Sequence, residues 1–187
     1  MTPGRIIILN GTSGSGKSSL SVEMQKQLDE PFWHVSSDQL ISAKILPKRD
    51  FEGGKFNWKI MRPNFFQAFH NCIPAIAETG NSIILDHIIE KEEWLHQLQI
   101  LLSGFDVLFI GLHCNIHELE TRELSRVNSS PGLKRFIGES KEHLNTHNFC
   151  NYDFEINTSI TPISTNAKLT IEAWKQRKAT SLFFRRI

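Results

Sequence analysis

The sequence predicts a three-layer α/β fold, in which helices cover both faces of a central, mainly parallel sheet of five strands. Short β-branched and aliphatic runs alternate with amphipathic segments along most of the chain, the pattern of strands joined by helical crossovers. The chain has 187 residues, of which 40% are hydrophobic. This length supports one sizeable hydrophobic core but not two, so we expect a single domain over residues 1–187.

The elements follow in order from these patterns. Residues 5–10 form an aliphatic run typical of a buried strand, and the segment after it has Leu20, Met24 and Leu28 at helical spacing. Strands are expected at 5–10, 32–36, 82–86, 106–112 and 153–157, and helices at 17–29, 64–79, 91–103, 115–127, 133–145 and 165–177. Residues 46–63 are rich in Pro, Gly and aromatic residues and predict a long irregular excursion. Such a segment would lie near the carboxyl ends of the strands, where α/β sheets bind their ligands.

A phosphate-binding motif stands between the first strand and the first helix. The pattern G-x-x-x-x-G-K-[ST] occupies residues 11–18. Backbone N–H groups of such a loop cradle phosphates at a helix N-terminus, while Lys17 reaches the β- and γ-phosphates and the Ser18 hydroxyl ligates Mg²⁺. The predicted nucleotide-binding residues are Gly11, Thr12, Ser13, Gly14, Ser15, Gly16, Lys17, Ser18 and Ser19. A guanine-specific N-K-x-D motif is absent from the sequence, so ATP with Mg²⁺ is the expected ligand.

Two aspartates follow the ends of predicted strands, where α/β sheets bind their ligands. Asp38 comes just after the second strand and is a candidate general base that accepts the proton of an attacking hydroxyl. Asp86 closes the third strand and is a candidate Mg²⁺ ligand, directly or through water. Each has a simpler interpretation as the N-cap of the helix that follows. His87 is either a substrate contact or a packed histidine.

An arginine pair lies in a predicted helical lid over residues 115–147. Arg122 and Arg126 are four residues apart, so a helix places both on one face. The Asn-Ser-Ser-Pro-Gly turn at 128–132 follows them and predicts a hinge. Such a lid would bring both arginines to a triphosphate as catalytic residues. Alternatively, the helix is a solvated one, in which nearby glutamates pair the arginines.

Composition limits the remaining function classes. The three cysteines (Cys72, Cys114, Cys150) are widely spaced, which favours a reducing compartment and a cytoplasmic location. The net charge of +1 gives no basic footprint for nucleic acid, and no apolar stretch is long enough to span a membrane. The oligomeric state stays open.

His113, Cys114 and His117 lack a fourth ligand at suitable spacing, so they are interpreted as packing and solvent-facing residues. The tail at 181–187 is apolar and basic. Three interpretations stay open: it docks on the sheet, it pairs subunits, or it has no fixed structure.

With these motifs assembled, the chain resembles the chloramphenicol phosphotransferase-like family of P-loop kinases. The resemblance runs through residues 6–18, 35–41, 80–87, 104–114, 120–123, His147 and 152–159. Its most specific parts are the block Gly80-Asn81-Ser82-Ile83-Ile84-Leu85-Asp86-His87 and the pair Tyr152-Asp153. The chain departs from the family pattern at Glu142, where a glutamine is usual, at 126–129, where Arg-Gly-Asp-Arg is frequent, and over 46–63.

The resemblance implies a P-loop kinase that transfers the γ-phosphate of ATP to a hydroxyl of a small molecule, with Asp38 as general base. It also implies that Lys17 and Ser18 hold phosphate and Mg²⁺ and that Arg122 and Arg126 face the phosphates. The acceptor, whose pocket the excursion at 46–63 would line, is chloramphenicol or an unrelated alcohol. Two other interpretations stay open: a zeta-toxin-like kinase of nucleotide sugars, and a non-kinase regulatory module that hydrolyses ATP slowly.

Overall fold

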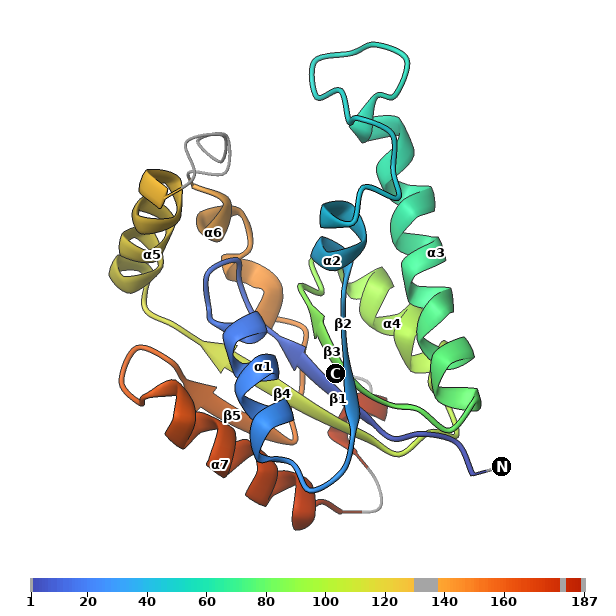
Figure 1. The fold of residues 1–187 in the computed structure, drawn as a ribbon, viewed down its shortest axis with the longest axis vertical. Helices are drawn as coiled ribbons and strands as arrows, with labels where there is room; N and C mark the ends of the chain where they lie inside the picture. Colours follow the sequence, from blue (N-terminus) through green and yellow to red (C-terminus); the bar gives the residue numbers. More distant parts are fainter. Residues whose placement is uncertain (1, 130–137, 179–180, 186–187) are drawn as a thin grey trace.

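A five-stranded parallel sheet forms the centre of the molecule (Figure 1). The computed structural model describes residues 2–129, 138–178 and 181–185. The strand order is β2-β3-β1-β4-β5, and the phosphate-binding motif follows the central strand. The strands are β1 (Ile6–Asn10), β2 (Phe32–Ser36), β3 (Ser82–His87), β4 (Val107–His113) and β5 (Phe154–Asn157). Each lies within one residue of its expected range.

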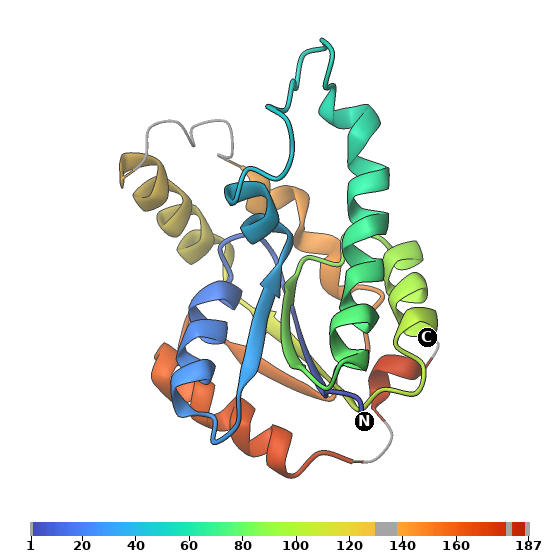
Figure 2. The ribbon, with the colours of Figure 1, turned by 45° about the vertical axis from the view of Figure 1, so that its right-hand side comes forward.

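Helices cover both faces of this sheet and complete a three-layer architecture (Figures 1 and 2). On one face lie α1 (Lys17–Gln27) and α7 (Ile163–Lys175), which pack against each other. On the other lie α3 (Trp58–Glu78), α4 (Glu92–Leu101) and the short helix η3 (Leu182–Phe184). The elements at the carboxyl edge are α2 (Ser37–Ser42), α5 (Ile116–Ser129), α6 (Glu139–Glu142) and η2 (Leu144–His147). None of the described helices is both long enough and apolar enough to cross a membrane.

The central strand supplies both halves of the core. Ile6 and Ile8 of β1 point into the cluster under α3 and α4, whereas Ile7 and Leu9 point into the cluster under α1 and α7. All four side chains are fully buried, as expected of a strand covered on both faces. The hydrophobic layers therefore fix β1, and with it the start of the phosphate loop.

Three sequence predictions were wrong in their boundaries. Helix α3 begins at Trp58 rather than residue 64, because the Asn57 side chain caps it and Pro63 is accommodated in its second turn. The irregular excursion is therefore 46–57, not 46–63. The helix expected to follow Asp38 begins one residue before it, as α2, whose N-cap is Ser36. The helix expected at 133–145 is replaced, over its described part, by α6 and the start of η2, while residues 133–137 lie outside the described residues.

The carboxyl-terminal tail docks on the sheet through η3. Phe183 is 1% exposed and its ring lies 5.1 Å from that of Phe109 on β4. The Asp153 carboxylate accepts hydrogen bonds from the Ser181 hydroxyl and the Leu182 N–H. Of the three interpretations of the tail, docking on the sheet describes residues 181–185.

A buried amide joins the end of β1 to two distant segments. Asn10 is fully buried, and its amide nitrogen donates to the Tyr152 hydroxyl at 2.8 Å. Its amide oxygen accepts from the Ile89 N–H at 2.9 Å and from the Thr146 hydroxyl at 3.3 Å. The Tyr152 ring fits beside β4 only because Gly111 lacks a side chain, since a Cβ there would lie 2.7 Å from two ring carbons.

Gly111→Ala is expected to lower the free energy of unfolding by about 1–3 kcal/mol, the usual cost of overpacking a core. Urea unfolding measures the loss. Tyr152→Ala serves as the partner mutation, because removing the ring removes the clash. The loss in the double variant should then be smaller than the sum of the two single losses. Strictly additive losses would show that the ring does not set the requirement for glycine at position 111.

Candidate active site

The phosphate loop closes around the side chain of its own lysine. Lys17 is 7% exposed, and its ammonium donates to the carbonyl oxygens of Gly11 at 3.0 Å and Thr12 at 2.9 Å. Gly16 caps α1 with φ of 96°, a left-handed conformation that favours glycine. The loop therefore joins a fixed cation to the N-terminus of a helix, which is the arrangement that binds phosphate anions.

Ser18 and Asp86 lie next to each other beneath this loop. The Ser18 hydroxyl donates to the Asp86 carboxylate at 2.5 Å, and His34 on β2 is 3.3 Å from the same carboxylate oxygen. Asp86 is 6% exposed. Burial alone would raise its pKa, but hydrogen bonds from His34 and Ser18 and the charge of Lys17 together lower the pKa below its usual value. A hydroxyl and an ionised carboxylate in contact are hard oxygen donors, which fit Mg²⁺.

Asp86 is not a helix cap. It belongs to β3, opposite Leu9 of β1 in the parallel register. The following helix, α4, begins at Glu92, and its N-cap residue Lys91 makes no side-chain capping bond. The simpler interpretation of this aspartate is therefore wrong.

Asp38 is not the cap of α2 either. The Ser36 side chain accepts from the Gln39 N–H at 3.2 Å, and the Gln39 side chain returns the bond in a capping box. Asp38 stands one residue into the helix, in its first turn, and is exposed. Its carboxylate is thus available at the carboxyl edge of the sheet.

Two cavities meet at this edge. The loop cavity, of about 540 Å³, is lined by the phosphate loop, Asp86, Arg122 and the segment after β5. The outer cavity, of about 780 Å³, is lined by α2, the start of α3, the residues after β3 and also by Arg49, Phe51, Glu123, Arg126, Glu142 and His143. Four residues line both cavities: Ser13, Asp38, Ile88 and Arg126. Both volumes fall in the range of ligand-binding sites.

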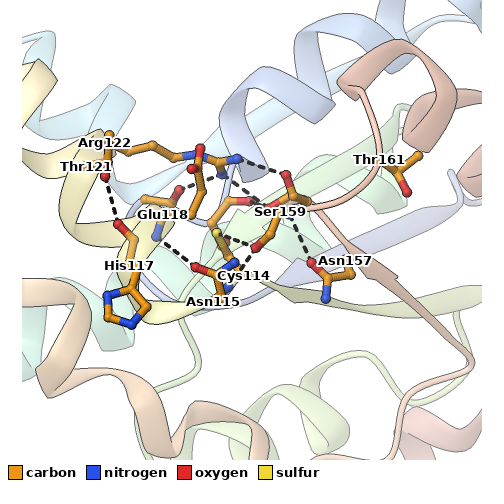
Figure 3. Close-up of polar contacts among 12 residues, drawn as sticks. Cys114, Asn115, His117, Glu118, Thr121, Arg122, Asn157, Ser159 and Thr161 are labelled. Atoms are coloured by element: carbon orange, nitrogen blue, oxygen red, sulfur yellow. Dashed lines mark hydrogen bonds and ion pairs between the residues drawn. The ribbon is translucent and has the colours of Figure 1, made fainter.

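The arginines of α5 face the phosphate loop. Arg122 donates to the Gly14 carbonyl at 3.2 Å and to the Thr158 carbonyl at 2.9 Å, and it forms an ion pair with Glu118 at 2.9 Å (Figure 3). The guanidinium of Arg126 lies 3.2 Å from where a Cβ of Gly14 would be. Helix α5 thus places both arginine side chains on the side of the loop cavity. Arg122 forms an ion pair with Glu118, but its guanidinium still points toward the loop and not toward solvent.

The start of α5 is fixed to the ends of the neighbouring strands (Figure 3). The Asn115 side chain caps the helix through the Glu118 N–H at 2.8 Å, and the Asn115 N–H donates to the Ser159 hydroxyl at 2.7 Å. That hydroxyl also contacts the Cys114 sulfur at 3.3 Å. These bonds orient the helix axis and with it Arg122.

His113, Cys114 and His117 contact other groups of the protein. His113 bonds to Glu155 at 2.6 Å, Cys114 contacts Ser159, and the His117 carbonyl accepts from the Thr121 hydroxyl. Within the described ranges, no group of three or more His, Cys, Asp or Glu side chains is arranged to hold a metal ion.

His87 is a packed residue that also contributes to the lining of the loop cavity. It is 2% exposed, and its Nε2 lies 2.9 Å from that of His70. Rings of Phe66, Phe69 and Trp94 surround the pair. Burial, together with the charge that His70 would carry, lowers the pKa of His87 well below its usual value, so the pair stays uncharged near neutrality.

Sequence reasoning missed two groups that shape the site. Thr158, which follows β5, donates to the Ser15 carbonyl at 2.7 Å and receives the Arg122 guanidinium. In the outer cavity, Arg62 donates to both oxygens of Glu90, at 2.5 and 2.6 Å. Thr158 lies in the 152–159 block of the family resemblance, but nothing in that block indicates a bond to the phosphate loop. An isolated Arg–Glu pair carries no motif, so only the fold reveals these contacts.

The comparisons with known proteins agree with this geometry. The model of the chloramphenicol phosphotransferase-like protein family matches residues 4–175. The chain belongs to this family. Two Mycobacterium tuberculosis proteins, of strains CDC 1551 and H37Rv, bear the provisional name O-phosphotransferase. Each is 28% identical over 194 residues, which cover 94% of this chain and 84% of theirs.

Solved structures of the same fold include P-loop kinases. The M. tuberculosis APS kinase in complex with AMPPNP and APS has a TM-score of 0.68 at 17% identity, covering 94% of this chain and 99% of that one. The Deinococcus radiodurans tunicamycin resistance protein has a TM-score of 0.63 at 15% identity, covering 95% and 98%. The predicted three-layer P-loop fold is thereby confirmed, and the protein is a phosphotransferase of the P-loop kinase type.

The ion pairs of Glu90 in the outer cavity predict how the free energy of unfolding depends on pH. Burial would raise the pKa of Glu90, but hydrogen bonds from His143 and Arg62 and their charges outweigh burial and lower the pKa. A carboxyl with a lowered pKa stabilises the fold above its unfolded pKa, about 4.3, and this contribution is lost as pH falls through the folded value. Glu90→Gln should therefore be less stable than the wild type at pH 7 and should lose less stability between about pH 6 and 3.

The measurement is urea unfolding at several pH values. Glu78→Gln is the matched control, because this glutamate is exposed at the end of α3 and forms no ion pair within the described part of the chain. Its acid profile should follow the wild type. Parallel profiles for Glu90→Gln and the wild type would contradict the assignment.

Proposed function

We propose that the protein transfers the γ-phosphoryl group of Mg-ATP to a hydroxyl group of a small acceptor. The loop cavity would hold the triphosphate, and the outer cavity would hold the acceptor. The observation that carries this proposal is the position of Asp38 on the wall that both cavities share. A base for phosphoryl transfer must touch the acceptor hydroxyl while that hydroxyl faces the γ-phosphate.

The reaction then needs few further groups. The acceptor oxygen attacks the γ-phosphorus, the bond from that phosphorus to the β–γ bridging oxygen breaks, and ADP leaves with the bridging oxygen. The proton of the acceptor hydroxyl passes to the Asp38 carboxylate. Positioning and electrostatic stabilisation account for most of the catalysis in this reaction class.

The residues of the loop cavity fit a nucleoside triphosphate with its metal. Lys17 would exchange its bonds to loop carbonyls for phosphate oxygens. The Ser18 hydroxyl and the Asp86 carboxylate would hold Mg²⁺, which supplies charge neutralisation at the β- and γ-phosphates when bound. ATP is the proposed nucleotide.

The two arginines would divide the stabilisation of the transition state. Arg122 is tied to backbone carbonyls of the loop and of Thr158, so it would hold the loop and its bound phosphates in place. Arg126 is exposed and lies on the shared wall, where developing charge on the transferred group would be greatest. The segment 115–147 would act as a lid that excludes water when both ligands are bound.

Asp38→Asn is expected to lower the acceptor-stimulated turnover by about 10²–10⁴, the usual contribution of a general base. The assay follows ADP release from Mg-ATP with a panel of hydroxylated antibiotics, nucleosides and sugars. Asp29→Asn is the matched control, since Asp29 is exposed and its one ion pair among the described residues is with Lys175, on the amino-terminal side of the sheet. An equal, slow ATPase in wild type and Asp38→Asn, with no stimulation by any acceptor, would instead favour a regulatory ATPase.

Asp86→Asn is expected to raise the Mg²⁺ concentration for half-maximal turnover by about tenfold or more, because an amide replaces an anionic oxygen donor. Titration of Mg²⁺ at saturating ATP measures the shift. Glu78→Gln, far from the loop, should leave the midpoint unchanged. An unchanged midpoint in Asp86→Asn would remove this residue from the metal site.

A further inference from the structure

Within the described part of the chain, the His34 ring on β2 has one polar partner, the carboxylate of Asp86. β2 is an edge strand, and its parallel register places His34 beside Ile84 and Ser36 beside Asp86. Residues two apart in a strand point to the same face, so the ring lies on the side of the sheet that α1 covers. The His34 side chain is 11% exposed, and a mostly buried imidazole needs a hydrogen-bond partner.

Two donors hold the same oxygen of this carboxylate. The Ser18 hydroxyl donates to Asp86 Oδ2 at 2.5 Å, and His34 Nε2 lies 3.3 Å from the same Oδ2. No third donor among the described residues forms a hydrogen bond with Asp86, although this residue is only 6% exposed. Asp86 lines the loop cavity, so Oδ1 is the oxygen that the carboxylate keeps for a ligand there.

The imidazole acts on the site only through Asp86. Ser18 and Asp86 line the loop cavity, whereas His34 is not among the described residues that do so. A ligand in this cavity therefore does not touch His34. Without the ring, Ser18 would be the one remaining hydrogen-bond donor to a buried carboxylate, and the carboxylate would be free to turn. Outer partners of this kind fix the orientation of carboxylates that bind metals.

We infer that His34 is a positioning residue of the Mg²⁺ site, whose Nε2–H holds Oδ2 of Asp86 so that Oδ1 stays available to the cation, directly or through water. This inference rests on the proposed function, because it takes Asp86 as part of the metal site. A histidine that served only the fold would stabilise the edge of the sheet without a specific effect on metal binding.

The test measures binding and not turnover. Calorimetry gives the affinity for ADP in excess EDTA and at increasing free Mg²⁺, and the midpoint is the Mg²⁺ concentration that gives half of the gain in affinity. His34→Ala is expected to raise this midpoint by about 10–100-fold, the usual effect of losing an outer partner of a metal ligand. Its affinity for ADP in EDTA should equal that of the wild type. His96→Ala is the matched control, since His96 is exposed on α4, on the opposite face of the sheet.

Two further variants identify the nitrogen that acts. The side-chain amide nitrogen of glutamine has the reach of histidine Nε2, whereas that of asparagine has the reach of Nδ1, and both amides donate hydrogen bonds without a charge. His34→Gln should therefore restore a midpoint close to that of the wild type, and His34→Asn should resemble His34→Ala. This comparison also holds if His34→Ala itself fails to fold.

Three results would overturn the inference and leave the proposed kinase intact. They are a wild-type midpoint in His34→Ala, an equal loss of ADP affinity with and without Mg²⁺, and the same midpoint in His34→Gln and His34→Asn. A wild-type affinity for ADP that does not respond to Mg²⁺ would instead overturn both this inference and the metal site of the proposed function.

Discussion

The parallel register of β1 between β3 and β4 is the constraint on which the site depends. Leu9 pairs with Asp86 and Ile110, and Asn10 pairs with His87 and Gly111. Because β1 is buried on both faces, a shift by one residue would place every side chain in the wrong core. The same register aligns the carboxyl ends of the strands, so the phosphate loop begins beside the end of β3, just beyond the level of Asp86. The contact between Ser18 and Asp86 follows from this alignment.

The Asn10 amide extends this constraint beyond the sheet. One of its bonds reaches Ile89, which follows β3. The other two reach Thr146 in η2 and Tyr152 just before β5, so they tie β1 to the segment that leads from the lid region back to the sheet. A buried polar group is costly unless its hydrogen bonds are satisfied, so these partners must stay together in the folded state. The start of the phosphate loop and the end of the lid region near Thr146 therefore share one buried hydrogen-bond network, whereas the arginines of α5 lie outside it.

The sequence contained enough to predict the strands, the phosphate loop and the fold class, because these depend on local patterns. It also placed Asp38 and Asp86 at the right edge, since acids after buried strands must lie there in a parallel sheet. It could not show that Ser36 caps α2, which frees Asp38, or that α3 starts before Pro63. The outer cavity is built from α2, the excursion, α3 and the lid region. No local pattern connects Arg49 to Arg62 or Glu90, and only tertiary packing brings them together.

The central claim is that Asp38 lies where an acceptor hydroxyl meets the γ-phosphate. The most direct measurement uses ATP labelled with ¹⁸O in the γ-phosphoryl group, incubated with the protein and a fraction of small metabolites, and follows the label by mass spectrometry. We predict a phosphate monoester that carries the label with the wild-type protein and is lost in Asp38→Asn. Label found only in inorganic phosphate, at the same rate with both proteins, would contradict the account.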